Sequence, residues 1–187
     1  MLHKHHPCVQ IIRGLPGSGK STEAKKYDCL HLELDMYCVR GRKYVWNSKQ
    51  DKVAHNLLNW AIRDAMREGI DIVVAGVMPK ASGTLANIVG WARDFGYDVH
   101  ILTLPKKYKD VHGCSKADLD RFEAMFESDE RVWNYLKAEI PDQKFLNYNV
   151  IFGKMAYSAK VIAPEEQGEY LRRTAEIHNA FPSGRHG

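Results

Sequence analysis

The pattern GxxxxGK[ST] constrains the fold of this chain more than any other feature, and residues 14–21 (GLPGSGKS) satisfy it in full. Glycine permits backbone angles that turn successive N–H groups inward, so that they form a nest for phosphate oxygens. A helix that starts directly after such a turn adds unpaired amides and partial positive charge at its N-terminus. The motif therefore predicts a phosphate-binding loop between a strand and a helix.

The surrounding sequence is consistent with both elements. Residues 8–13 (CVQIIR) are typical of a buried strand, and residues 21–27 are predicted to form the helix. Lys20 is placed to reach the β- and γ-phosphates of a nucleoside triphosphate, and the Ser21 hydroxyl to ligate Mg²⁺. A glycine-rich turn without a ligand is the alternative, which this context disfavours. We therefore expect ATP and Mg²⁺ as cofactors, bound by Gly14, Leu15, Pro16, Gly17, Ser18, Gly19, Lys20, Ser21 and Thr22.

Apolar runs alternate with helical periodicity along most of the chain. The predicted strands cover residues 8–13, 29–34, 70–77 and 97–104, and the predicted helices after the first cover 49–68, 81–95, 115–127 and 128–140. Strands that alternate with helices indicate βαβ crossovers and a parallel sheet. The expected fold class is α/β, a three-layer αβα fold with a parallel central sheet and a small lid after the fourth strand.

Length and composition bound the remaining possibilities. The 187 residues suit one domain, with a core over about 8–140 and a C-terminal extension over about 141–187, where residues 150–152 are a possible strand and 164–180 a helix. Four cysteines without CxxC spacing indicate reduced thiols and a cytoplasmic location. The start of the chain lacks an apolar signal region, and its apolar runs are too short for a bilayer span, so no membrane partner is expected. The net charge of +4 suits a polyanionic partner without requiring one.

Asp35 is a second candidate for chemistry, because it ends the predicted strand over residues 29–34. Ligands of open α/β sheets bind outside the carboxyl ends of the strands. A carboxylate there can accept the proton of an attacking hydroxyl, as kinases require of a general base. The alternative is a helix N-cap, for which aspartate is also common.

These motifs together resemble a known family. Residues 13–22 (RGLPGSGKST), 35–37 (DMY), 44–47 (YVWN), 65–70 (AMREGI) and 111–115 (VHGCS) are similar to the zeta-toxin/polynucleotide-kinase-like branch of P-loop kinases, over about residues 8–130. The resemblance implies the P-loop NTPase fold and transfer of the ATP γ-phosphate to a polynucleotide 5′-hydroxyl. It also implies that Asp35 is the base and Lys20 the catalytic lysine.

Two departures from the family pattern concern the acceptor and the metal. Met36 replaces a second aspartate, and Cys38 stands where the family has an arginine, so that Arg40 and Arg42 are its possible substitutes. The third strand ends in residues 74–78 (VAGVM) without an acid, which leaves Mg²⁺ to Ser21, the phosphates and water. The departures are consistent with a changed acceptor pocket or a weakened catalyst.

Basic and aromatic residues suggest the remaining contacts. The resemblance places a lid after the fourth strand, with Lys107, Lys109 and Arg121 as candidates to contact the transferred phosphate, against the alternative of a solvated turn. Trp46, beside Arg40 and Arg42, is a candidate for stacking on an acceptor base, against the alternative of a flexible solvated loop.

Three functions are compatible with these features. The favoured one is an ATP-dependent kinase that acts on a polynucleotide 5′-hydroxyl. A kinase for a nucleoside, a nucleotide or a modified DNA base is the second. A non-catalytic module that binds ATP or nucleic acid is the third, because the third strand lacks polar residues at its end.

Overall fold

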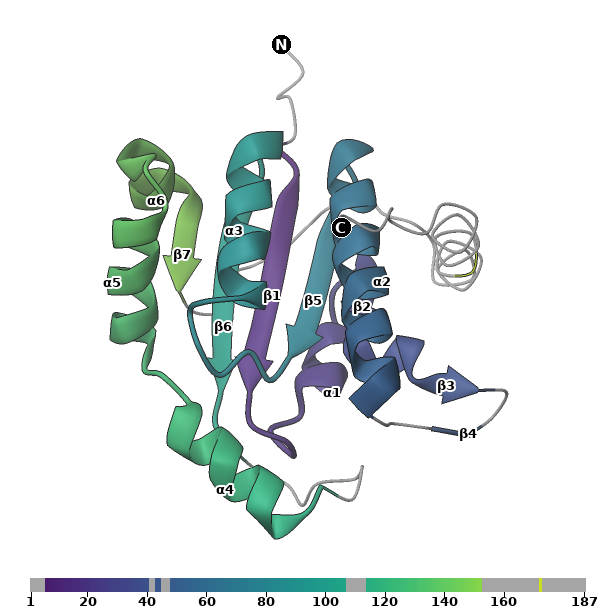
Figure 1. The fold of residues 1–187 in the computed structure, drawn as a ribbon. Helices are drawn as coiled ribbons and strands as arrows, with labels where there is room; N and C mark the ends of the chain where they lie inside the picture. The colour runs from purple at the N-terminus through teal and green to yellow at the C-terminus, as the bar shows by residue number, and fades with distance from the viewer. Residues whose placement is uncertain (1–5, 41–42, 45–47, 107–113, 153–171, 173–187) are drawn as a thin grey trace, which may run out of the picture.

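A five-stranded parallel sheet forms the centre of the molecule in the computed structural model, which describes residues 6–40, 43–44, 48–106, 114–152 and 172 (Figure 1). The strand order is β2-β5-β1-β6-β7. Their bounds are β1 (Cys8–Gly14), β2 (Leu30–Glu33), β5 (Ile72–Gly76), β6 (Asp98–Leu104) and β7 (Val150–Phe152). The first strand of the chain is therefore central, with chain crossovers to either side of it, which is where open α/β sheets bind ligands.

The central position of β1 follows from its composition. All seven of its residues are buried, as expected of a parallel strand covered on both faces. Ile11 pairs in register with Val74 of β5 and Ile101 of β6, so that apolar side chains line up across three strands. Burying each such side chain contributes about 1.5–3 kcal/mol.

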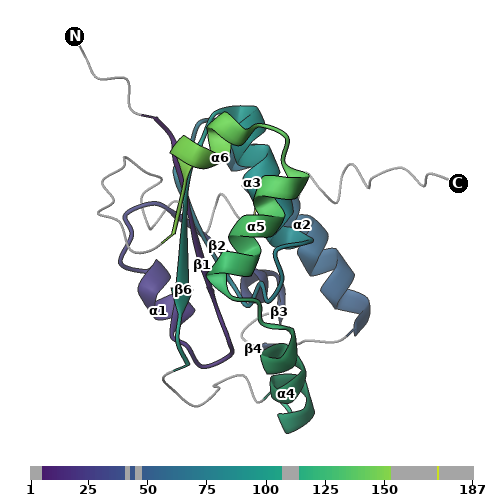
Figure 2. The same ribbon diagram turned by 90° about the vertical axis from the view of Figure 1, so that its left-hand side faces the viewer.

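Helices cover both faces of this sheet. Their bounds are α1 (Lys20–Ala24), α2 (Ser48–Arg67), α3 (Thr84–Phe95), α4 (Lys116–Met125), α5 (Asp129–Glu139) and α6 (Gln143–Asn149). Figure 2 shows α2, α3, α5 and α6 on one face and α1 on the other. The helix α4 lies apart, below the carboxyl ends of the strands (Figure 1). This is the three-layer αβα architecture of a P-loop NTPase, and the predicted fold class is confirmed.

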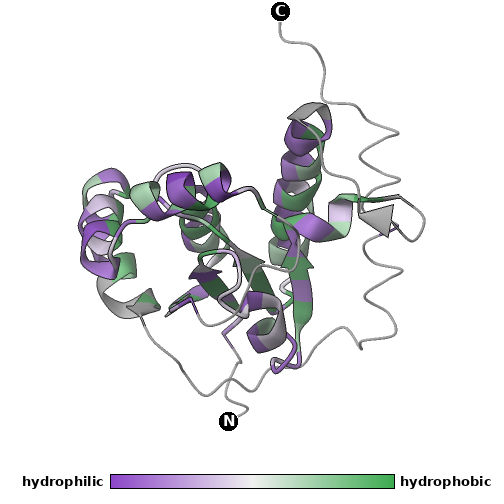
Figure 3. Cartoon of the chain, turned by 90° about the horizontal axis from the view of Figure 1, so that it is seen from below, coloured by the Kyte–Doolittle hydropathy of each residue, from purple (hydrophilic) through white to green (hydrophobic). Residues whose placement is uncertain are grey.

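Alternation along the strands divides the core into two unequal parts. Val9 and Ile11 face the large cluster under α2, α3 and α5, whereas Ile12 faces a small cluster that includes Ala24 of α1. Hydrophobic colour accordingly concentrates in the strands in Figure 3, and the helices are mixed.

Local signals set the ends of several helices. The Ser115 hydroxyl accepts a hydrogen bond from the Asp118 amide at 3.1 Å, and the Ser128 hydroxyl accepts one from the Arg131 amide at 3.3 Å. These two N-caps begin α4 and α5. Gly96 ends α3 with a φ of 74°, a left-handed angle that glycine adopts without strain.

The sequence predicts most of these elements to within a few residues. The helix after the glycine loop is shorter than expected and ends at Ala24. A 3₁₀ turn, η1 (Leu34–Tyr37), a short antiparallel hairpin of β3 (Val39–Arg40) and β4 (Lys43–Tyr44), and α6 are additions. The helix expected over 164–180 lies outside the described residues except at position 172. Within the described part of the chain, no helix has the length and apolarity needed to cross a bilayer.

Candidate active site

The glycine loop connects β1 to α1 at the carboxyl edge of the sheet, as the motif predicts. Gly17 and Gly19 have φ angles of 80° and 87°, which side-chain-bearing residues rarely adopt. The Ser18 amide donates to the Leu15 carbonyl at 3.1 Å and closes the turn. The loop thus has the alternating backbone of an anion-binding nest.

Gly14 is required for a different reason, which is space. A Cβ atom built on Gly14 lies 2.5 Å from the Ser18 Oγ and 2.8 Å from the Leu104 carbonyl oxygen. The second contact is with backbone and cannot be relieved by a side-chain rotation. Only glycine therefore allows β1 to pass into the loop beside the end of β6.

Lys20 and Ser21 begin α1, and each has a hydrogen-bond partner. The Lys20 Nζ donates to the Leu15 carbonyl at 2.9 Å, so its side chain lies over its own loop. The Ser21 hydroxyl donates to the Glu33 Oε2 at 2.8 Å. The two side chains predicted to contact phosphate and metal thus lie at the same loop, and the second of them contacts a carboxylate.

Glu33 is a functional candidate that the sequence motifs do not reveal. It ends β2, and it is the register partner of Ala75 on β5, the strand end that lacks an acid. The His31 Nε2 lies 3.7 Å from the Glu33 Oε2. Burial alone would raise the pKa of the Glu33 carboxyl, but the nearby His31 ring and the hydrogen bond from Ser21 lower it below its usual value. Glu33 therefore carries negative charge at neutral pH.

A hydroxyl and a carboxylate together are the donor set that Mg²⁺ prefers, because this ion takes oxygen ligands and keeps several waters. Ser21 and Glu33 fit that requirement at 2.8 Å from each other. The signal in the sequence was the pair Glu33 and Asp35 at the end of one strand, two acids separated by one residue.

Asp35 lies in η1, the 3₁₀ turn that directly follows β2 at the carboxyl edge. Its carbonyl accepts a hydrogen bond from the Cys38 amide at 3.1 Å. Glu33 occupies the N-cap position of this turn. The N-cap alternative therefore does not account for Asp35, which is the second residue of the turn.

A second group of contacts joins the loop region to the segment between α4 and α5. The Arg13 side chain is fully buried, and its guanidinium carbon lies 4.4 Å from the centre of the Phe126 ring. Its Nη2 donates to the Glu127 carbonyl at 2.5 Å. Burial lowers the pKa of Arg13, although Asp129 and Glu127 act in the opposite direction. Arg13 directly precedes Gly14, so one residue links the phosphate loop to the base of α4.

Glu127 fixes the same segment to the loop after β5. Its amide donates to the Pro79 carbonyl at 2.8 Å, and its Oε2 accepts from the Ala81 amide at 2.8 Å. We call Phe126, Glu127 and their partners Arg13, Pro79 and Ala81 the lid joint. It holds the start of α5 against the ends of β1 and β5.

The helix α4 beyond this joint is far less constrained. None of its ten residues is buried. Arg121 forms an ion pair with Asp118 at 3.0 Å and lies 5.3 Å from the Phe122 ring centre, both on the same helix. The structure therefore places Arg121 on α4, and both of these contacts lie within that helix.

The remaining predicted site residues lie beyond what the structure describes. Arg42, Trp46, Lys107 and Lys109 are outside the described residues, and Arg40 is described only as part of β3. The structure thus brings together the loop over residues 14–22, Asp35 and the newly identified Glu33 at the carboxyl edge of the sheet.

Comparison with known proteins yields similarity of fold. No family model matches the sequence. The chain resembles a structure from the PezAT chromosomal toxin-antitoxin system of Streptococcus pneumoniae, with 13% identity, a TM-score of 0.45, and coverage of 97% of this chain and 88% of that one. APE1195 gives 16% identity and a TM-score of 0.43, with 95% and 98% covered.

A chain of the Pnkp1/Rnl/Hen1 complex gives 13% identity and a TM-score of 0.42. The match covers 65% of this chain and 40% of that chain, so the present chain spans less than half of its length.

Proposed function

We propose that this chain is an ATP-dependent phosphotransferase that moves the γ-phosphate to a hydroxyl acceptor, most favourably the 5′-hydroxyl of a polynucleotide. The observation that supports it best is the 2.8 Å hydrogen bond between Ser21 of the glycine loop and Glu33. Glu33 is two residues before Asp35 in the chain, so the proposed metal-binding pair and the candidate base belong to one sheet edge.

The loop amides bind and orient the triphosphate in this proposal. Lys20 exchanges its hydrogen bond with the Leu15 carbonyl for one with a phosphate oxygen. A hydrogen bond from a charged group to a neutral carbonyl contributes about 1.5–3 kcal/mol net. A phosphate oxygen adds opposite charge to the same ammonium group and therefore competes for it favourably.

Ser21 and Glu33 would hold Mg²⁺, which supplies neutralisation of the charge that develops on the phosphate oxygens. The low pKa of Glu33 favours this role, because an ionised carboxylate is needed at neutral pH. In this proposal Glu33 of β2 provides the acid that is absent from the end of the neighbouring strand β5.

Asp35 accepts the proton of the acceptor hydroxyl as that oxygen attacks the γ-phosphorus. The new P–O bond forms while the bond to the β,γ-bridging oxygen breaks, and ADP leaves. Proton and phosphoryl group are both accounted for by Asp35, the acceptor and ADP.

The test is a screen of acceptors with γ-labelled ATP and Mg²⁺. Wild-type protein is expected to label 5′-hydroxyl oligonucleotides, and Lys20→Ala and Asp35→Asn are expected to reduce transfer by about two orders of magnitude or more. If a nucleoside, a nucleotide or a modified base is labelled instead, the proposed acceptor is wrong and the proposed kinase activity stands. Binding of ATP with no transfer to any acceptor would favour a non-catalytic module, with which the apolar segment 75–77 is compatible.

A further inference from the structure

A small cavity opens beside η1, outside the glycine loop. Its volume is about 220 Å³, and it is lined by Tyr37, Val39, Gln50, Val53 and Ala54. Pockets that enclose a whole drug-sized ligand occupy roughly 300–1,000 Å³. The cavity therefore has room for one ring-sized group, and not for a complete nucleotide.

Its lining combines apolar walls with two groups suited to a planar ring. Val39 and Val53 are 49% and 50% exposed, and in the described part of the chain only Phe95 joins them as an exposed large hydrophobic residue. Two of these three side chains thus border one hollow, which is typical of a binding surface. Tyr37 contributes an aromatic face for stacking, and Gln50 contributes an amide that both donates and accepts hydrogen bonds.

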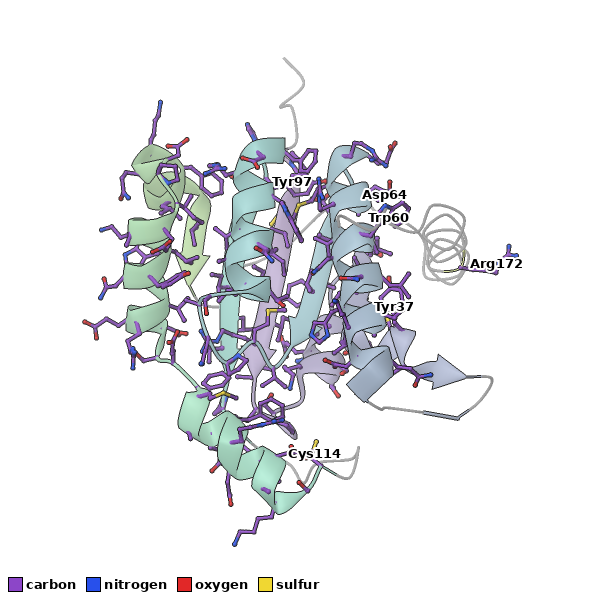
Figure 4. All side chains as sticks on the ribbon, viewed as in Figure 1. Tyr37, Trp60, Asp64, Tyr97, Cys114 and Arg172 are labelled. Atoms are coloured by element: carbon purple, nitrogen blue, oxygen red, sulfur yellow. The ribbon has the colours of Figure 1, made fainter. Side chains whose placement is uncertain are left out.

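The cavity lies close to the candidate base. Tyr37 is the last residue of η1 and Asp35 is its second, so their Cα atoms are at most about 7 Å apart. Figure 4 shows Tyr37 alongside α2, the helix that carries Gln50 and Val53. The candidate base and the cavity therefore share one turn, with Asp35 two residues before Tyr37.

Charge on the adjoining hairpin indicates what the ring belongs to. Val39 starts β3, and the next residue, Arg40, is the register partner of Lys43 in β4. Two cationic residue types in the hairpin that Val39 begins suit a heterocycle that continues into phosphodiesters. An uncharged sugar acceptor would gain nothing from them.

We propose that this cavity binds the 5′-terminal base of a polynucleotide acceptor, and that Tyr37, Gln50 and Val53 determine acceptor specificity. The inference rests on the proposed function and deepens it. It assigns the acceptor's base to the space between η1 and α2, and it leaves the sugar hydroxyl to Asp35.

The test uses a short 5′-hydroxyl oligonucleotide with 2-aminopurine at its 5′ end, and a second oligonucleotide whose 5′ residue is abasic. Both are titrated into the full chain with Mg²⁺ and a non-hydrolysable ATP analogue, and transfer is measured separately with ATP. Val53→Asp places a charge on the cavity wall at a half-exposed position. Phe95→Asp is the matched control, because Phe95 is 38% exposed and lies at the end of α3.

Wild-type protein is expected to quench the 2-aminopurine and to bind the abasic oligonucleotide about tenfold more weakly. Val53→Asp should remove that tenfold preference, and Phe95→Asp should retain it. Equal binding of both oligonucleotides, or a preference unchanged by Val53→Asp, overturns the inference even where transfer is efficient. If 2-aminopurine is quenched but no phosphate is transferred, the cavity assignment stands and the proposed kinase activity is wrong. A shift from dimer to monomer on Val53→Asp, with the preference retained, means that a second copy covers the cavity and also overturns the inference.

Discussion

The Ser21 hydroxyl and the Glu33 carboxylate are joined by a hydrogen bond of 2.8 Å across the gap between α1 and β2. Ser21 is the last residue of the glycine motif, and Glu33 is the last residue of β2, an outermost strand of the sheet. The contact connects the loop that would hold phosphates to an acid twelve residues later in the chain. Several measurable properties depend on it.

Glu33→Gln should weaken the effect of Mg²⁺ on ATP binding. The amide keeps the size of the side chain but loses the charge, so we expect the gain in ATP affinity on adding Mg²⁺ to fall by about tenfold. Calorimetry with ATP in Mg²⁺ and in EDTA measures this gain. Glu68→Gln is the control, because Glu68 is exposed and directly follows α2. Identical Mg²⁺ dependence in wild type and Glu33→Gln would remove Glu33 from the metal site.

The same residue should make stability depend on pH. The folded-state pKa of Glu33 lies below its usual value of 4.5, so its contribution to stability is present above that value and is lost as the pH falls through the folded pKa. The stability difference between wild type and Glu33→Gln should therefore be constant near neutrality and shrink below about pH 4.5. Urea unfolding at a series of pH values measures it, and a difference that grows on acidification contradicts the assignment.

Gly14→Ala should abolish ATP binding and destabilise the fold. The added methyl group meets the Leu104 carbonyl oxygen at 2.8 Å, and forced overpacking of this kind costs about 1–3 kcal/mol. Gly90→Ala is the matched control in α3, because its Cβ meets no atom within 4 Å. We expect that change to raise the free energy of unfolding by up to about 1 kcal/mol. Thermal unfolding and ATP calorimetry on both variants measure the contrast.

Arg13→Met should loosen the lid joint. The variant loses the hydrogen bond to the Glu127 carbonyl and the stacking on Phe126. We therefore expect its free energy of unfolding, measured by urea denaturation, to fall by about 1–3 kcal/mol. Arg13→Lys should rescue little, because a planar guanidinium is required for stacking and lysine is a point charge. Arg121→Met is the comparison, since its exposed ion pair contributes less than about 1 kcal/mol.

Limited proteolysis reports on the joint independently of global stability. Arg13→Met should expose α4 and its junction with α5 to cleavage under conditions in which the remainder of the chain resists. Equal cleavage rates in wild type and Arg13→Met would show that Arg13 has no part in holding this segment.

Sequence periodicity and helix-ending glycines predicted the helices whose bounds depend on neighbouring residues. The apolar period of α2 predicted that helix to within one residue at each end, and Gly96 predicted the end of α3, because both signals operate over a few neighbouring positions. The start of α3 lies three residues later than predicted, at Thr84. The hairpin of β3 and β4 escaped prediction because each of its strands has only two residues. So short a run has no recognisable alternation.

The missed site residues depend on distant partners. Arg13 is the second-to-last residue of the apolar strand β1. Its partners in the core are Phe126 and Glu127, and Glu127 is 114 positions away. Glu33 follows His31 in a strand of alternating polarity, and nothing near it in the sequence indicates Ser21 as its partner. Contacts of this kind can be identified only when the order and pairing of the strands are known.

The pairing of Glu33 with Ala75 on adjacent parallel strands has a consequence for how relatives of this chain should be compared. An acid at either of these two positions lies near the same edge of the sheet, beside the glycine loop. A relative could therefore carry its carboxylate on either strand and still place it near the Ser21 hydroxyl. A column-by-column alignment would record such a protein as defective, whereas a comparison of atoms in space would count its carboxylate as relocated.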